Sequence, residues 1–122
     1  MPILEIEYIA TKGELIPGDL AQRIADAAES IFNSPKGTIW IKLRQLEADG
    51  YAENGIPSTS TPRPVFAKVL KRKAGDESTL RGEAMALARC IAQQMDRDVE
   101  NIHIIYEASA QGRIAFGGEL LC

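Results

Sequence analysis

A chain of 122 residues with 45% hydrophobic and 25% charged residues has the composition of an ordinary globular domain. It is long enough to bury a modest core, and we expect residues 1–122 to form a single domain. The formal net charge of −3 gives no reason to expect a nucleic-acid partner. No apolar run approaches the roughly 20 residues of a membrane span, and no basic-then-apolar leader opens the sequence, so no membrane partner is expected.

Cysteine and histidine are scarce. Two cysteines, Cys90 and Cys122, do not make a disulfide framework, and reduced thiols indicate a cytoplasmic protein. The single histidine has no close cluster of other metal-ligating side chains, which argues against a transition-metal site.

The first nine residues alternate apolar and charged side chains, as in a half-buried strand. Pro2 follows Met1, and a small second residue normally permits removal of the methionine. Pro2 would then carry a secondary amine. An α-amino group titrates near pH 7.7–8.0, and an apolar pocket or nearby cations lower its pKa further, so it could act as a general base. The alternative is that Pro2 merely starts an edge strand, where its missing N–H costs nothing.

The first half of the chain reads as strand, helix and strand. A turn at residues 10–13 follows the first strand. Asp19 is expected to be either the cap or a first-turn acid of a helix whose apolar residues recur at helical spacing over 20–31. Alternation over 38–46 predicts the second strand. The connection 47–64 is rich in Gly, Ser, Thr and Pro, and loops of this length tend to be functional or mobile.

The second half repeats this order. Residues 65–73 read as a strand, 80–95 as a helix with an apolar stripe, and 102–107 as a fourth strand. The glycine-bearing tail over 111–118 suggests a short hairpin.

The two halves, 1–61 and 62–122, match in register, since Leu80 follows Leu20 by 60 positions and His103 follows Trp40 by 63. Such self-similarity indicates one β-α-β unit written twice. A single unit cannot cover its own sheet, and the crossover helix makes its two strands parallel. We therefore predict an α+β (α/β) fold with a four-stranded mixed sheet, two helices on one face and a short C-terminal hairpin. Two architectures fit: a ferredoxin-like sandwich, or two units related by a pseudo-twofold axis that associate into a trimer.

The strand that begins at Pro2 and the tail over 115–120 (Ala-Phe-Gly-Gly-Glu-Leu) resemble the tautomerase superfamily, which includes 4-oxalocrotonate tautomerase, 5-carboxymethyl-2-hydroxymuconate isomerase and macrophage migration inhibitory factor. The resemblance implies a cofactor-independent enzyme that forms a homotrimer. It also implies that Pro2, without Met1, is the catalytic base and then acid. The implied partner is a small-molecule carboxylate, a 2-oxo or 2-hydroxy unsaturated acid that undergoes keto–enol tautomerisation.

The same resemblance implies cations that bind the substrate carboxylate. Lys12 stands where a relative carries a substrate-binding arginine, although lysine lacks the bidentate fork. Arg72 matches a carboxylate-binding arginine of the dehalogenase branch, but the second arginine of that branch is Gly75 here. Lys36 lies near a lysine that lines the pocket in the migration inhibitory factor branch. The lysines around Arg72 have another interpretation as a solvated strand end.

Three further side chains are candidate pocket residues. His103 occupies a position where relatives place a pocket-facing arginine or tyrosine, but a lone histidine on a strand is commonly a surface or packing residue. Trp40, its repeat partner, belongs either to the core, which we expect, or to the pocket wall. Phe116 is either an apolar wall beside the proline amine or a plug of the hairpin.

Other branches of the superfamily fit less well. The dehalogenase and hydratase branch needs an acidic residue to activate water, and Phe116 stands at the corresponding position. The decarboxylase branch pairs the proline with an aspartate near the second strand, where no acid precedes Trp40. Tautomerisation therefore remains the predicted reaction, and a non-catalytic trimer or small-ligand module of the same fold is the alternative.

Overall fold

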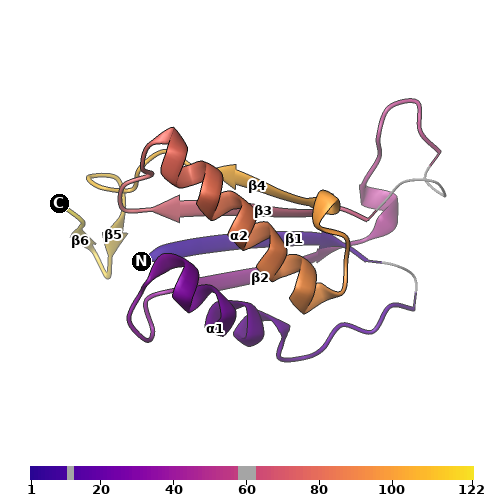
Figure 1. The fold of residues 1–122 in the computed structure, drawn as a ribbon, viewed down its shortest axis with the longest axis horizontal. Helices are drawn as coiled ribbons and strands as arrows, with labels where there is room; N and C mark the ends of the chain where they lie inside the picture. Colours follow the sequence, from indigo (N-terminus) through magenta and orange to yellow (C-terminus); the bar gives the residue numbers. More distant parts are fainter. Residues whose placement is uncertain (11–12, 58–62) are drawn as a thin grey trace.

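Two β-α-β units make up most of the chain in the computed structural model, which describes residues 1–10, 13–57 and 63–122. The first unit consists of β1 (Pro2–Ile9), α1 (Leu20–Phe32) and β2 (Trp40–Leu46), and the second of β3 (Val65–Lys71), α2 (Glu77–Met95) and β4 (Ile102–Tyr106). Two 3₁₀ turns, η1 (Ala48–Gly50) and η2 (Val99–Asn101), lie in connections, and β5 (Ala115–Phe116) pairs with β6 (Glu119–Leu120) in a hairpin. Both helices lie on one face of the sheet (Figure 1).

The order of strands in the sheet is β2-β1-β3-β4. Each unit pairs its own two strands in parallel, and β1 pairs with β3 antiparallel, so an approximate twofold axis passes between β1 and β3. A split β-α-β unit of the ferredoxin-like type would have another strand between its two strands. Direct pairing within each unit therefore favours the pseudo-twofold architecture, and the predicted mixed sheet with two helices and a hairpin is confirmed.

The first strand is central, so the interpretation of Pro2 as the start of an edge strand is wrong. Pro2 opposes Lys71 on β3, and Ile3 opposes Trp40 on β2. A proline is tolerated in a central strand at its first residue, where the missing N–H interrupts little of the ladder.

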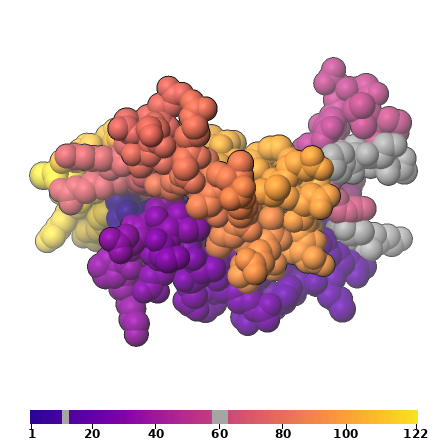
Figure 2. All heavy atoms as spheres, viewed as in Figure 1, coloured from indigo at the N-terminus to yellow at the C-terminus, as the bar shows by residue number. Residues whose placement is uncertain are grey.

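The core lies between the sheet and the helices. The central strands contribute two period-2 series of buried side chains, and the helices close over them (Figure 2). The fully buried large side chains are Leu4, Ile6, Leu20, Ile24, Val65, Val69, Leu87 and Ile91. The opposite face of the sheet, which the helices do not cover, carries charged and aromatic residues. No helix of the described residues is long and apolar enough to cross a bilayer.

Local hydrogen bonds and backbone conformation determine where the two helices begin and end. The side chain of Asp76 accepts a hydrogen bond of 2.8 Å from the backbone N–H of Thr79, and this bond lowers the pKa of the carboxyl group. Asp19 precedes α1 as expected, but its side chain binds Arg23 at 3.0 Å and makes no capping bond. Both helices end at a left-handed residue, Asn33 and Asp96, which are types that tolerate this conformation.

The hairpin of the tail is displaced from the prediction of 111–118. Its strands are Ala115–Phe116 and Glu119–Leu120, joined by Gly117 and Gly118. These glycines have φ of 58° and 90°, and two central residues with positive φ are what a type I′ turn requires.

Candidate active site

Most of the predicted site residues lie at the end of the sheet where β1 begins. The parallel strands β1 and β2 start side by side there, with Ile3 opposite Trp40. Strand β3 ends there because it is antiparallel to β1, so that Pro2 opposes Lys71. The chain N-terminus and the β5–β6 hairpin lie at this same end (Figure 1).

Pro2 is buried and shares the helix-facing side of β1 with Leu4 and Ile6. Met1 is half-buried. A peptide bond to Met1 makes the Pro2 nitrogen an amide without basicity, so this nitrogen becomes a base only when Met1 is removed.

Trp40 and Phe116 form an aromatic pair beside the start of β1. Their ring centroids are 5.5 Å apart at an interplanar angle of 89°, an edge-to-face contact. The indole N–H of Trp40 donates to the carbonyl of Gly37 at 3.0 Å. Trp40 is 50% exposed, so the expectation that it belongs to the core is wrong. The physical reason is its position at the first residue of an outer strand, on the face that no helix covers.

The contact between these rings holds the tail hairpin against the sheet, which gives a direct prediction. Replacing Phe116 with alanine should cost about 0.5–1.5 kcal/mol of this contact and leave the indole of Trp40 more exposed. Trp40 is the single tryptophan of the chain, so its emission should shift to longer wavelength and become more sensitive to an aqueous quencher. Leu120→Ala, at a 56% exposed position of the same hairpin, is the matched control. An emission spectrum unchanged by Phe116→Ala would contradict the contact.

The predicted cations differ in their surroundings. Lys36 is exposed in the loop before β2 and lines, with Trp40 and α1, a shallow groove of about 290 Å³. Arg72 is exposed just after β3, and its guanidinium donates to the backbone oxygen of Cys122. Arg72 therefore fastens the tail to the end of β3. Lys12 lies outside the described residues.

His103 lies at the other end of the sheet. It is the cross-strand partner of Phe66, and the two rings are 5.4 Å apart. Phe66 in turn opposes Glu7, five residues along β1 from Pro2, and a rise of about 3.3 Å per residue makes this separation on the order of 17 Å. Within one chain, the structure does not bring His103 to Pro2, so a role in the same pocket would require a second copy.

Sequence reasoning missed a polar network on the helix side of this end. The ammonium of Lys71 binds Glu83 at 2.8 Å and the carbonyl of Ala74 at 3.1 Å. The hydroxyl of Tyr106 donates to the other oxygen of Glu83 at 3.2 Å. Burial, and then the charge of Glu83, raises the pKa of Tyr106. Lys71 continues the period-2 series of buried residues on β3, and this signal could have separated it from its solvated neighbours.

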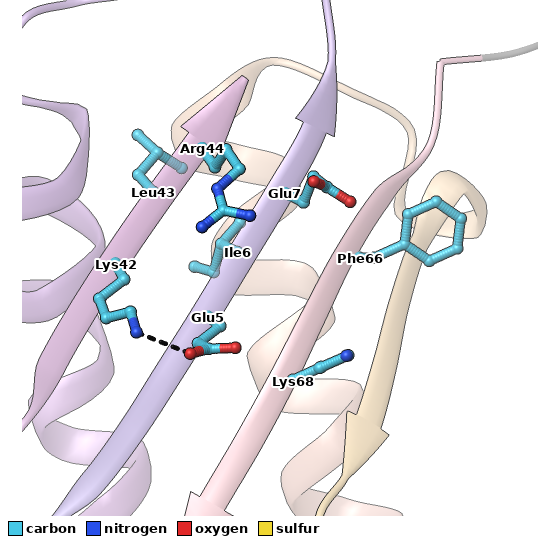
Figure 3. A pocket seen from close by; sticks show the side chains of 8 residues that line it. All are labelled: Glu5, Ile6, Glu7, Lys42, Leu43, Arg44, Phe66 and Lys68. Atoms are coloured by element: carbon cyan, nitrogen blue, oxygen red, sulfur yellow. Dashed lines mark hydrogen bonds and ion pairs between the residues drawn. The ribbon is translucent and has the colours of Figure 1, made fainter. Parts of the chain in front are cut away.

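The helix-free face of the sheet has a patterned charge distribution (Figure 3). Acidic side chains of β1 lie between basic side chains of β2 and β3, and together they line a depression of about 190 Å³. Lys42 binds Glu5 at 2.7 Å, and this hydrogen bond and charge lower the pKa of Glu5. The charged residues that line the depression are Glu5, Glu7, Lys42, Arg44 and Lys68.

A larger groove of about 360 Å³ lies on this same face, next to the start of β1. Apolar side chains of Ile3, Leu70 and Ile114 line it together with two cations, Lys68 and Arg113, and two carboxylates, Glu5 and Glu107. The apolar walls and the two cations are groups that could bind a small organic carboxylate. The sequence analysis did not single out Arg113, because only the path of the tail brings it to this groove.

No group of three or more His, Cys, Asp or Glu side chains within residues 1–10, 13–57 and 63–122 could hold a metal ion.

No protein-family model matches the sequence, and no curated protein matches it at a significant level. Solved structures do match. Macrophage migration inhibitory factor from Oncomelania hupensis superposes with a TM-score of 0.71 at 18% identity, over 98% of this chain and 81% of that chain. A fused 4-OT, solved as a symmetric trimer, gives a TM-score of 0.73 at 12% identity, over 97% and 94%. Pt0534 inactivated by 2-oxo-3-pentynoate gives 0.74 at 14% identity, again over 97% and 94%.

The chain has the tautomerase-superfamily fold. The resemblance read from Pro2 and from the glycine-bearing tail is thus confirmed at the level of the fold. Structures with this fold include 4-OT enzymes and macrophage migration inhibitory factor. At identities below 20% the likeness establishes the architecture, and the activity has to be argued from the site.

Proposed function

We propose that this chain, once Met1 is removed, is a cofactor-independent tautomerase of a small 2-oxo or 2-hydroxy unsaturated acid. The observation that carries the proposal is that one end of a tautomerase-superfamily sheet combines Pro2 with an aromatic pair and with cations. Apolar walls favour the neutral amine and cations attract the carboxylate, which are the two requirements of a base that acts on an anionic substrate.

The chemistry needs a single proton carrier. The neutral amine of Pro2 takes a proton from a carbon or hydroxyl oxygen of the substrate, and negative charge develops on the conjugated oxygen. The protonated amine then returns the proton to the other end of the conjugated system. A nearby cation stabilises the charge that develops between the two steps, and Lys36, Lys68 and Arg113 are the candidates at this end of the sheet.

Three predicted residues, Arg72, Lys12 and His103, are less directly placed to act in this proposal. The bond to the Cys122 oxygen uses one nitrogen of the Arg72 guanidinium, and the remaining N–H donors are left to bind a carboxylate. Lys12 remains a candidate cation, although it lies outside the described residues. His103 enters the site only if a neighbouring copy of the chain brings it there.

We also propose a homotrimer. Its support is the symmetric trimer of the fused 4-OT, together with two outer strands, β2 and β4, and a charged sheet face that the helices leave open. Outer strands that pair between copies by a repeated rotation generate a closed ring.

The amino terminus provides the test. Protein produced without a tag should lack Met1 by intact mass, and 2-oxo-3-pentynoate, which inactivates Pt0534, should then modify it. An alkynyl ketone accepts a nucleophile at its β-carbon, so the Pro2 nitrogen forms the new bond and its proton passes to the adjacent carbon. The mass therefore rises by that of one whole reagent molecule.

Thiols react with the same reagent, so the experiment needs a thiol control. Cys122 is exposed, whereas burial raises the pKa of the half-buried Cys90. Labelling in a Cys122→Ser background, followed by peptide mapping, should locate the adduct on Pro2. A retained Met1, or an adduct on cysteine alone, would favour the non-catalytic alternative.

A further inference from the structure

A nearly buried ion pair begins on the strand next to Pro2, at the residue that opposes it. Pro2 and Lys71 are cross-strand partners, and opposing residues of an antiparallel pair have Cα atoms about 4.5–5.5 Å apart. Both residues continue the series whose members face the helices, so the Lys71 side chain leaves the sheet on the same side as the Pro2 ring.

Three elements fix this pair. Lys71 on β3 binds Glu83 on α2, and the side chains are only 17% and 10% exposed. Lys71 donates to Oε2 of Glu83, and the hydroxyl of Tyr106 on β4 donates to the other oxygen, Oε1. Because its pKa is raised by burial and by Glu83, Tyr106 keeps its proton and remains a donor throughout the neutral range. Charges held with so little water nearby act on their neighbours more strongly than exposed charges do.

We infer that Lys71, Glu83 and Tyr106 form a positioning unit that sets the proton affinity of the Pro2 amine by holding one positive and one negative charge beside it. This inference rests on the proposed role of Pro2. While both charges are present, their opposite effects on the amine largely cancel, and the apolar surroundings then decide its protonation. A network of this kind acts through Pro2 and need not touch the substrate.

Other charged groups reach this end of the sheet, but they are exposed and water screens them. They come from β1 and β2, the end of α1 and its loop to β2, the start of α2, and the segments that follow β3 and β4. These groups are Glu5, Lys42, Glu29, Lys36, Arg72, Asp76, Glu77, Arg81 and Glu107.

The inference predicts shifts of opposite sign for the two partners. Glu83→Gln leaves the ammonium of Lys71 uncompensated, so protonation of the amine becomes less favourable and its titration midpoint should fall by about one pH unit. Lys71→Gln leaves the carboxylate of Glu83 uncompensated, and the midpoint should rise by about one unit. The double variant removes both charges and should return the midpoint close to that of the unmodified protein.

The experiment is a pH titration of the ¹⁵N chemical shift of Pro2 in protein that lacks Met1. This measurement does not depend on turnover. Glu77→Gln is the matched control, because Glu77 also pairs with a cation, Arg81, on α2. The Glu77 side chain is 82% exposed, so its loss should not move the midpoint. Lys71→Arg keeps the charge and should keep the midpoint. Circular dichroism establishes that each variant is folded.

A purely structural ion pair makes a different prediction, because either single variant would then loosen the same contact and move the midpoint in the same direction. Shifts of the same sign, or no shift in either variant, would overturn the inference. If Lys71→Gln does not fold, the fall in Glu83→Gln and its reversal in the double variant decide the question. Failure of 2-oxo-3-pentynoate to label Pro2, with the opposite shifts intact, would count against the proposed activity alone.

Discussion

In protein that lacks Met1, Pro2→Ala should lower kcat/KM for a 2-oxo acid such as phenylpyruvate by about 10²–10⁴-fold, the usual contribution of a positioned general base. Alanine also permits removal of Met1, so the variant keeps a terminal amine. That amine is primary and lacks the ring that fixes its direction at the start of β1. The comparison therefore measures the secondary amine and its rigid position, while the fold stays the same.

Two companion proteins sharpen this result. A two-residue extension before Pro2 turns its nitrogen into an amide, and this protein should show at least as large a loss as Pro2→Ala. Pro17→Ala changes an exposed proline in the loop before α1 and should keep the activity of the unmodified protein. Near-normal turnover by the extended protein would show that the Pro2 nitrogen is not the base.

The alternation of residues along each strand predicted which face of the strand is buried. It did not predict which strands lie next to one another in the sheet. Alternation along residues 2–9 correctly separated the buried Leu4 and Ile6 from the exposed Glu5. Alternation contains no information about which strand is central. The errors about Pro2 and Trp40 share this origin, since Pro2 starts a central strand and Trp40 starts an outer one.

The internal repeat predicted the fold better than it predicted the site. A twofold axis between antiparallel β1 and β3 puts equivalent residues at opposite ends of the sheet. Trp40 and His103 are repeat partners, so the symmetry that relates them also separates them. A single pocket within one chain could not contain both, and this consequence follows from the antiparallel pairing, which the sequence does not state.

The polar network beside Pro2 shows a different limit. In the sequence, Lys71 belongs to a basic run that looks like a solvated strand end. Its partner Glu83 is twelve residues away on α2, and Tyr106 comes from β4. Only the packing of α2 across β3 and β4 brings the three groups together. Periodicity could have indicated that Lys71 points to the buried side of the sheet, but not that Glu83 neutralises its charge.

Leu87→Ala should lower the free energy of unfolding by about 2–5 kcal/mol, the cost of a cavity at a fully buried leucine. Leu87 is 0% exposed on α2, whereas Leu15, at 94% exposure, provides a matched control whose replacement by alanine should cost about 0.5 kcal/mol or less. Urea unfolding at one fixed protein concentration checks both values, because assembly makes apparent stability depend on concentration. Equal losses would contradict the assignment of Leu87 to the core.

The same variant separates packing from charge at the site. Leu87 lies one helical turn after Glu83, so the two side chains share a face of α2. If the ion pair acts on Pro2 through charge, Leu87→Ala should weaken the fold while the titration midpoint of Pro2 stays within a few tenths of a pH unit in the folded protein. If the midpoint instead moves as far as it does in Glu83→Gln, the position of α2, rather than the charge that it carries, would control the proline amine.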